Sequence, residues 1–157
     1  MRATFLALAM MAASPLAAQG TDTRFEQIFG ATAGATEIAS AVADCVAQDG
    51  DVARLTGAGW AKVDAFGGGQ MMAYRRGDQG PILALPAKSN PLRCWIMARP
   101  SDDEATTTKA IDGRLGVAAI GTTWRAGPHA VRMDWGATPD QRPVTRIEVY
   151  KIPQESK

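Results

Sequence analysis

The sequence predicts a single α+β domain in which two packed helices cover an antiparallel sheet of about five or six strands, with one disulfide. Three observations lead to this fold class. Two segments have apolar residues at helical spacing, and several others alternate apolar and polar residues as strands do. Short turns rich in Gly, Asn, Asp and Pro separate the alternating segments, which favours antiparallel neighbours. The chain also contains two cysteines, Cys45 and Cys94.

The N-terminus has the form of a secretory signal peptide, which we place at residues 1–18. Arg2 is followed by a short apolar run and then by small residues before Gln19. The run is too short to serve as a permanent membrane anchor. Residues 19–157 then make up the mature domain, and we expect the protein to be periplasmic or secreted.

Charge and hydropathy narrow the possible partners. The 17 basic and 16 acidic residues become 16 of each when Arg2 is removed with the signal peptide. A neutral mature chain has no electrostatic reason to bind nucleic acid, so we predict that it does not. We also expect no transmembrane segment in the mature chain, because no apolar stretch there approaches the length that a membrane helix needs.

The first helix is predicted over residues 34–48, after a leader with a short helical turn. Apolar residues recur at helical spacing, so Ile38, Val42 and Cys45 lie on one stripe. The Asp-Gly-Asp sequence at 49–51 has the residues of a turn and ends the helix. The stripe directs Cys45 into the core.

From residue 57 the apolar period changes to two. Strands are expected over 59–66, 70–76, 81–86 and 92–99. In the last of these, Cys94 shares a face with Ile96 and Ala98. Since two independent periodicities bury both cysteines, we predict that a Cys45–Cys94 disulfide joins the first helix to the sheet.

A second helix is expected after this strand. Ser101 and Glu104 have the S-x-x-E spacing of a capping box, and the helix would run to about Leu115 or Ala119. Two further alternating segments predict strands over 129–135 and 145–150.

Arginine and aromatic side chains lie together on two predicted strands, on the face of 92–99 opposite Cys94 and on one face of 70–76, and binding surfaces are rich in such residues. The candidates are Tyr74, Arg76, Arg93, Trp95 and Arg99. We predict that they bind a partner protein or an envelope glycan through stacking and charged hydrogen bonds. If the second helix covers this face instead, Trp95 belongs to the core and the arginines extend from its rim.

Catalytic and metal chemistry have little support in the sequence. The single histidine, His129, has Asp134 as its nearest acid, but five positions along a strand place the two on opposite faces. No G-x-S-x-G nucleophile motif is present. Two cysteines and one histidine supply at most three of the four usual zinc ligands, so we predict no metal and no cofactor.

Together these features predict a small exported, disulfide-stapled binding or accessory protein of a bacterial envelope that performs no catalysis. The alternative function is a periplasmic hydrolase in which His129 is the general base.

Overall fold

The computed structural model of the chain describes residues 29, 32–64, 69–78, 80–87 and 93–153. The predicted signal peptide at residues 1–18 lies outside the described residues. Within them, helices pack on an antiparallel sheet and Cys45 is joined to Cys94, so the predicted α+β class and the predicted disulfide are confirmed. No helix in the described ranges is long and apolar enough to cross a membrane.

The described helices are α2 (Ala35–Gln48), α3 (Val52–Gly57) and α4 (Glu104–Leu115). The described strands are β1 (Thr32–Ala33), β2 (Ala61–Val63), β3 (Met71–Arg75), β4 (Ile82–Pro86), β5 (Arg93–Pro100), β6 (Thr123–Ala126), β7 (His129–Ala137) and β8 (Pro143–Lys151). Their order across the sheet is β2-β3-β4-β5-β8-β7-β6, and β1 pairs in parallel with the end of β5.

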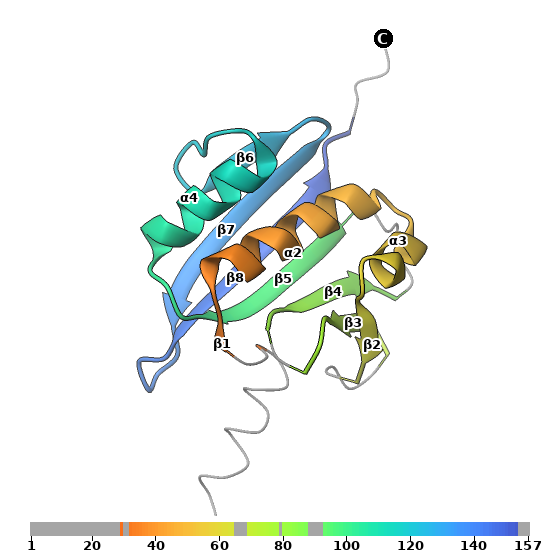
Figure 1. Cartoon of the computed structure of the whole chain (residues 1–157), viewed down its shortest axis with the longest axis horizontal. Helices are drawn as coiled ribbons and strands as arrows, with labels where there is room; N and C mark the ends of the chain where they lie inside the picture. The colour runs from red at the N-terminus through yellow and green to blue at the C-terminus, as the bar shows by residue number, and fades with distance from the viewer. Residues whose placement is uncertain (1–28, 30–31, 65–68, 79, 88–92, 154–157) are drawn as a thin grey trace, which may run out of the picture.

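Most of the described residues belong to two successive units, each with a long helix followed by a meander of antiparallel strands. α2 precedes β2 to β5, and α4 precedes β6 to β8. The last strands of the two units, β5 and β8, are antiparallel neighbours in the middle of the sheet (Figure 1). The seam between the two units is therefore the β5–β8 pairing.

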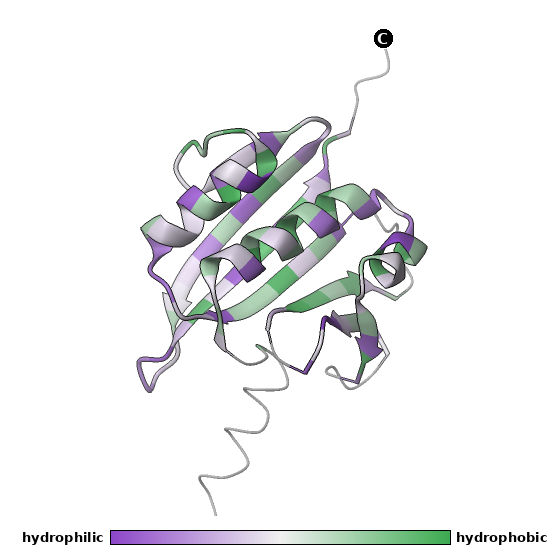
Figure 2. Cartoon of the chain, viewed as in Figure 1, coloured by the Kyte–Doolittle hydropathy of each residue, from purple (hydrophilic) through white to green (hydrophobic). Residues whose placement is uncertain are grey.

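The core lies between the sheet and the two long helices, which run side by side across the same face (Figure 1). The strand residues that point toward the helices are almost fully buried; they include Cys94, Ile96, Ala98, Val131, Met133, Ile147 and Val149. From α2, Ile38, Val42 and Cys45 are buried against them. Figure 2 shows the corresponding hydrophobic colouring along α2, β4 and β5.

The disulfide connects the buried side of α2 to the buried side of β5. The Cα atoms of Cys45 and Cys94 are 6.2 Å apart, within the range that a disulfide requires. Both residues are about 1% exposed. The stripe in α2 and the alternation in β5 were therefore sufficient to place this bond.

The start of the second helix differs from the prediction. α4 begins at Glu104, and its N-cap is Asp103, whose carboxylate accepts a hydrogen bond from the backbone N–H of Thr106 at 2.7 Å. Asp102 caps the other helix, because its carboxylate accepts from the backbone N–H of Ala35 at 2.7 Å. The capping box that Ser101 would open is thus replaced by two aspartates, one for each of two neighbouring helix N-termini.

Three short elements were not predicted from the sequence. β1, β6 and α3 contain two, four and six residues. Over so few positions neither a period of two nor a helical period stands out. The sheet therefore has eight described strands where five or six were predicted.

Candidate functional site

The structure separates the five predicted binding residues into three environments. Arg93, Trp95 and Arg99 lie on the side of β5 that faces away from α2 and α4. Tyr74 pairs with Leu83 in the sheet register and is buried on the helix side, where burial raises the pKa of its hydroxyl group. Arg76 follows β3 and turns toward α2. The predicted site is therefore not one cluster.

The side of β5 that carries Arg93 continues across β8, β7 and β6. In the other direction it continues across β4 and β3, where it carries Arg75 and the fully buried Ile82 and Ala84. We call the part on β5, β8, β7 and β6 the arginine face; its charged and large side chains are Arg93, Trp95, Met97, Arg99, Arg125, Arg132, Asp134, Arg146, Glu148 and Tyr150. The register places Glu148 opposite both Trp95 and Arg132, and Arg146 opposite both Met97 and Asp134. The side chains of Arg93, Arg132 and Arg146 are 56–60% exposed. In the described part of the chain, no helix packs on this face.

The two acids of the arginine face are already paired with arginines. Asp134 accepts hydrogen bonds from Arg132 and Arg146, each at 2.9 Å, and Glu148 lies 3.1 Å from the Nε atom of Arg93. Hydrogen bonds from Arg146 and Arg132 hold the pKa of Asp134 below its ordinary value, so this carboxylate is ionised at neutral pH. Among the residues that the structure describes, this face has five arginines and two carboxylates, so its described side chains have a positive net charge.

The position of α4 decides between the two interpretations of Trp95. α4 packs beside α2, on the face of the sheet that carries Cys94. Trp95 is partly exposed, and the guanidinium of Arg93 lies 5.8 Å from the centre of its ring. Trp95 is therefore not covered by the second helix, and an arginine and an indole stand together at the surface.

The sequence contained a signal for part of this surface. The alternation in the strands predicted over 129–135 and 145–150 already places Arg132 and Arg146 opposite the buried residues. It does not show that these strands continue the face of Arg93, because that depends on β8 pairing with β5. Arg125 lies in β6, which was not predicted.

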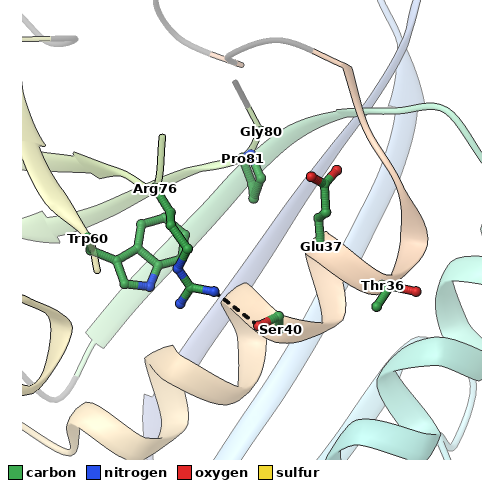
Figure 3. A pocket seen from close by; sticks show the side chains of 7 residues that line it. All are labelled: Thr36, Glu37, Ser40, Trp60, Arg76, Gly80 and Pro81. Carbon is green, nitrogen blue, oxygen red and sulfur yellow. Dashed lines mark hydrogen bonds between the residues drawn. The ribbon is translucent and has the colours of Figure 1, made fainter. Parts of the chain in front are cut away.

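Arg76 belongs to a separate pocket of about 300 Å³ between α2 and the ends of β3 and β4 (Figure 3). Its lining residues are Thr36, Glu37, Ser40, Trp60, Arg76, Gly80 and Pro81. The guanidinium of Arg76 lies over the ring of Trp60 at 4.8 Å, donates to the hydroxyl of Ser40 at 3.3 Å and forms an ion pair with Asp44. The charge of Arg76 is therefore used to hold the end of β3 against α2.

The groups around this pocket do not favour an anionic ligand. Asp44 binds both the indole N–H of Trp60, at 3.1 Å, and Arg76. Glu37 projects into the pocket from α2, and one of its carboxylate oxygens accepts from the backbone N–H of Gly34 at 2.9 Å. Arg76 is the one cation among the lining residues and already has a carboxylate partner. The pocket is thus a weaker candidate than the arginine face.

His129 has an acidic partner that is distant in sequence. Its Nε2 atom is 3.0 Å from a carboxylate oxygen of Asp49, and the ammonium of Lys151 is 3.1 Å from the same oxygen. Asp49 follows α2 with a φ of 36°, a conformation that few residues other than glycine adopt. The three side chains fasten the end of α2 to β7 and β8.

The geometry of His129 does not suit a general base. Nε2 is held by Asp49, and Nδ1 is buried without a hydrogen-bond partner among the described residues. A general base must reach the proton that it removes, and in this ring Nε2 is paired with Asp49 while Nδ1 is buried. In the described structure the His129–Asp49 pair connects the end of α2 to the start of β7.

Asp49→Asn is expected to destabilise the protein at neutral pH and to have little effect in strong acid. Lys151 and His129 lower the pKa of Asp49 in the folded chain, so its ionised form favours folding above the ordinary value of 3.8. This contribution is lost as the pH falls through the lower folded-state pKa. Chemical unfolding of both proteins between about pH 2 and 7 measures the difference.

The control for this experiment is Asp64→Asn, which removes the same charge from an exposed position. A difference between wild type and Asp49→Asn that stays constant down to the lowest pH would contradict the assignment.

The described residues contain no group of three or more His, Cys, Asp or Glu side chains that could hold a metal ion. No protein-family model, no curated protein and no solved structure matches the chain. The arguments about function therefore rest on the geometry of the surfaces above.

Proposed function

We propose that this chain is an exported binding protein that performs no catalysis and whose partner is a protein that docks on the arginine face. The observation that carries the proposal is the placement of Arg93, Trp95 and Arg99, with further arginines from β8, β7 and β6, on a sheet face that none of the described helices covers. Tryptophan and arginine side chains contribute most strongly to protein–protein binding when a partner excludes water from them.

Export is supported by two features. The first 18 residues have the charge and hydropathy pattern of a signal peptide. A disulfide between buried cysteines persists where the surroundings are oxidising, as in the periplasm or outside the cell. We propose a periplasmic or secreted location on these grounds.

The alternative of a hydrolase is less well supported. His129 does have the acidic partner that a catalytic dyad needs, but its second nitrogen is buried. A nucleophile or substrate would have to meet that nitrogen for the pair to act in catalysis. Unchanged turnover in a His129→Ala variant, for any activity that the protein proves to have, would exclude it.

The double variant Arg93→Ala/Trp95→Ala is expected to remain folded and to lose its partner. Truncating two partly exposed residues should cost about 1–2 kcal/mol of stability, whereas interface hot spots cost about 2 kcal/mol or more each in binding. The tagged mature protein is used to capture partners from an envelope fraction, and the captured proteins are identified by mass spectrometry.

The matched control is Thr108→Ala/Lys109→Ala on α4, on the opposite side of the molecule. A specific partner is one retained by wild type and by this control but lost by the double variant. If every captured protein is retained by the double variant, or if the double variant unfolds, the arginine face is not the binding site.

A further inference from the structure

The overall charge balance of the chain conceals a strong separation of charge. The described residues contain thirteen basic and thirteen acidic side chains. The arginine face holds five of the basic residues and two of the acidic ones, which leaves eight basic and eleven acidic residues elsewhere in the described chain. Eight of those acids lie in or beside α2 and α4; they are Glu37, Asp44, Asp49, Asp51, Asp102, Asp103, Glu104 and Asp112.

The described residues therefore form a positive sheet face and a negative helix layer, in which these eight acids outnumber Arg54, Lys109 and Arg114. This arrangement is not visible in the composition, because the two sides cancel. A separation of this kind orients the molecule in an electric field and accelerates encounters with a surface of opposite charge.

The chemistry of the positive side is also specific. Its basic residues are all arginines, whereas the described lysines, Lys62, Lys109 and Lys151, lie elsewhere. The guanidinium group binds a carboxylate through two parallel hydrogen bonds and is weakly hydrated, so arginine is the residue that suits charged pairs within an interface.

We infer that the partner docks an acidic protein surface, rich in Asp and Glu, onto the arginine face. This inference rests on the proposed binding function of the same face and adds the chemical class of the partner. Carboxylates of the partner pair with exposed arginines of the face such as Arg125, and the Arg93–Trp95 pair forms the aromatic centre of the contact.

Two other polyanions fit the face less well. Asp134 and Glu148 lie between the arginines and would repel a continuous phosphate backbone, whereas a protein can place a hydrogen-bond donor opposite them. A membrane surface would need protruding apolar side chains. Ile120, which is 88% exposed, lies between α4 and β6 and is not part of the arginine face.

Poly-L-glutamate is the probe for this inference, and its binding to the mature protein is followed by fluorescence anisotropy. Arg125→Gln/Arg146→Gln removes two charges from the arginine face, and Arg54→Gln/Arg114→Gln removes two exposed charges from the helix side. We expect the first variant to bind at least about tenfold more weakly than wild type, and the second to stay within about twofold. Raising the salt from about 50 to 200 mM should weaken wild-type binding several-fold.

Three results would overturn the inference: no binding of poly-L-glutamate at low salt, equal losses in the two variants, or tighter binding to duplex DNA or to phosphatidylglycerol vesicles. The capture experiment distinguishes failure of this inference from failure of the proposed binding function. If capture depends on Arg93 and Trp95 but poly-L-glutamate does not bind, the face still docks a partner and only its acidic character is wrong.

Discussion

Replacing Cys45 and Cys94 with alanine is expected to lower the free energy of unfolding by about 4 kcal/mol. The two cysteines are 49 positions apart, and the bond restricts the unfolded chain over that whole loop. Small domains are stable by only about 5–15 kcal/mol, so the loss is a large fraction of the total. Both side chains are buried between α2 and the sheet, so the alanines also leave some apolar contacts unfilled.

Urea unfolding of the oxidised protein and of the double variant measures this difference. Wild type treated with a reductant is the internal control, since it loses the bond without losing the sulfur atoms. We expect the free energy of unfolding of reduced wild type to lie between those of oxidised wild type and the double variant. A difference below about 1 kcal/mol between oxidised wild type and the double variant would contradict the entropic role assigned to the bond.

Trp124→Ala is expected to cost about 3–5 kcal/mol, whereas Trp95→Ala should cost about 1 kcal/mol. Trp124 is 1% exposed, and its indole N–H donates to the carboxylate of Asp112 in α4 at 2.6 Å. Its removal leaves a cavity beneath α4 and takes one donor from Asp112. Trp95 lies on the opposite face, where truncation exposes strand rather than opening a cavity.

Comparing the two tryptophan variants tests which face of the sheet is buried and which is exposed, because the same type of residue is removed from each. Both variants are measured by chemical unfolding under the same conditions, and Trp124→Phe is added because it keeps an aromatic ring but not the N–H donor. We expect the stability of Trp124→Phe to lie between those of wild type and Trp124→Ala. Equal losses for Trp95→Ala and Trp124→Ala would mean that the arginine face is part of the core.

The sequence was sufficient for the framework of the fold because long periodic segments are unambiguous. The stripe through Ile38, Val42 and Cys45 predicted α2, and the alternation around Cys94 predicted β5. Their agreement on which side is buried also predicted the disulfide. The same reasoning could not find β6 or α3, whose periodic patterns are too short.

The candidate site was predicted only in part, because a surface depends on which strands are neighbours. Arg93, Trp95 and Arg99 share one strand, so their common face follows from local alternation. Tyr74 and Arg76 lie in or directly after another strand, and the register shows that Tyr74 faces the helices. The contact of His129 with Asp49 joins positions 80 residues apart, and no local pattern predicts it.

The seam between β5 and β8 has a consequence for any attempt to shorten the protein. Arg93 and Arg99 come from the unit that begins with α2, whereas Arg125, Arg132 and Arg146 come from the unit that begins with α4. A fragment containing either unit alone would display two or three guanidinium groups and would expose the strand edge that the other unit normally occupies. Full affinity for a polyanion therefore requires that the two units have paired through β5 and β8. We expect a chain truncated at residue 100 to lose this binding and also to aggregate.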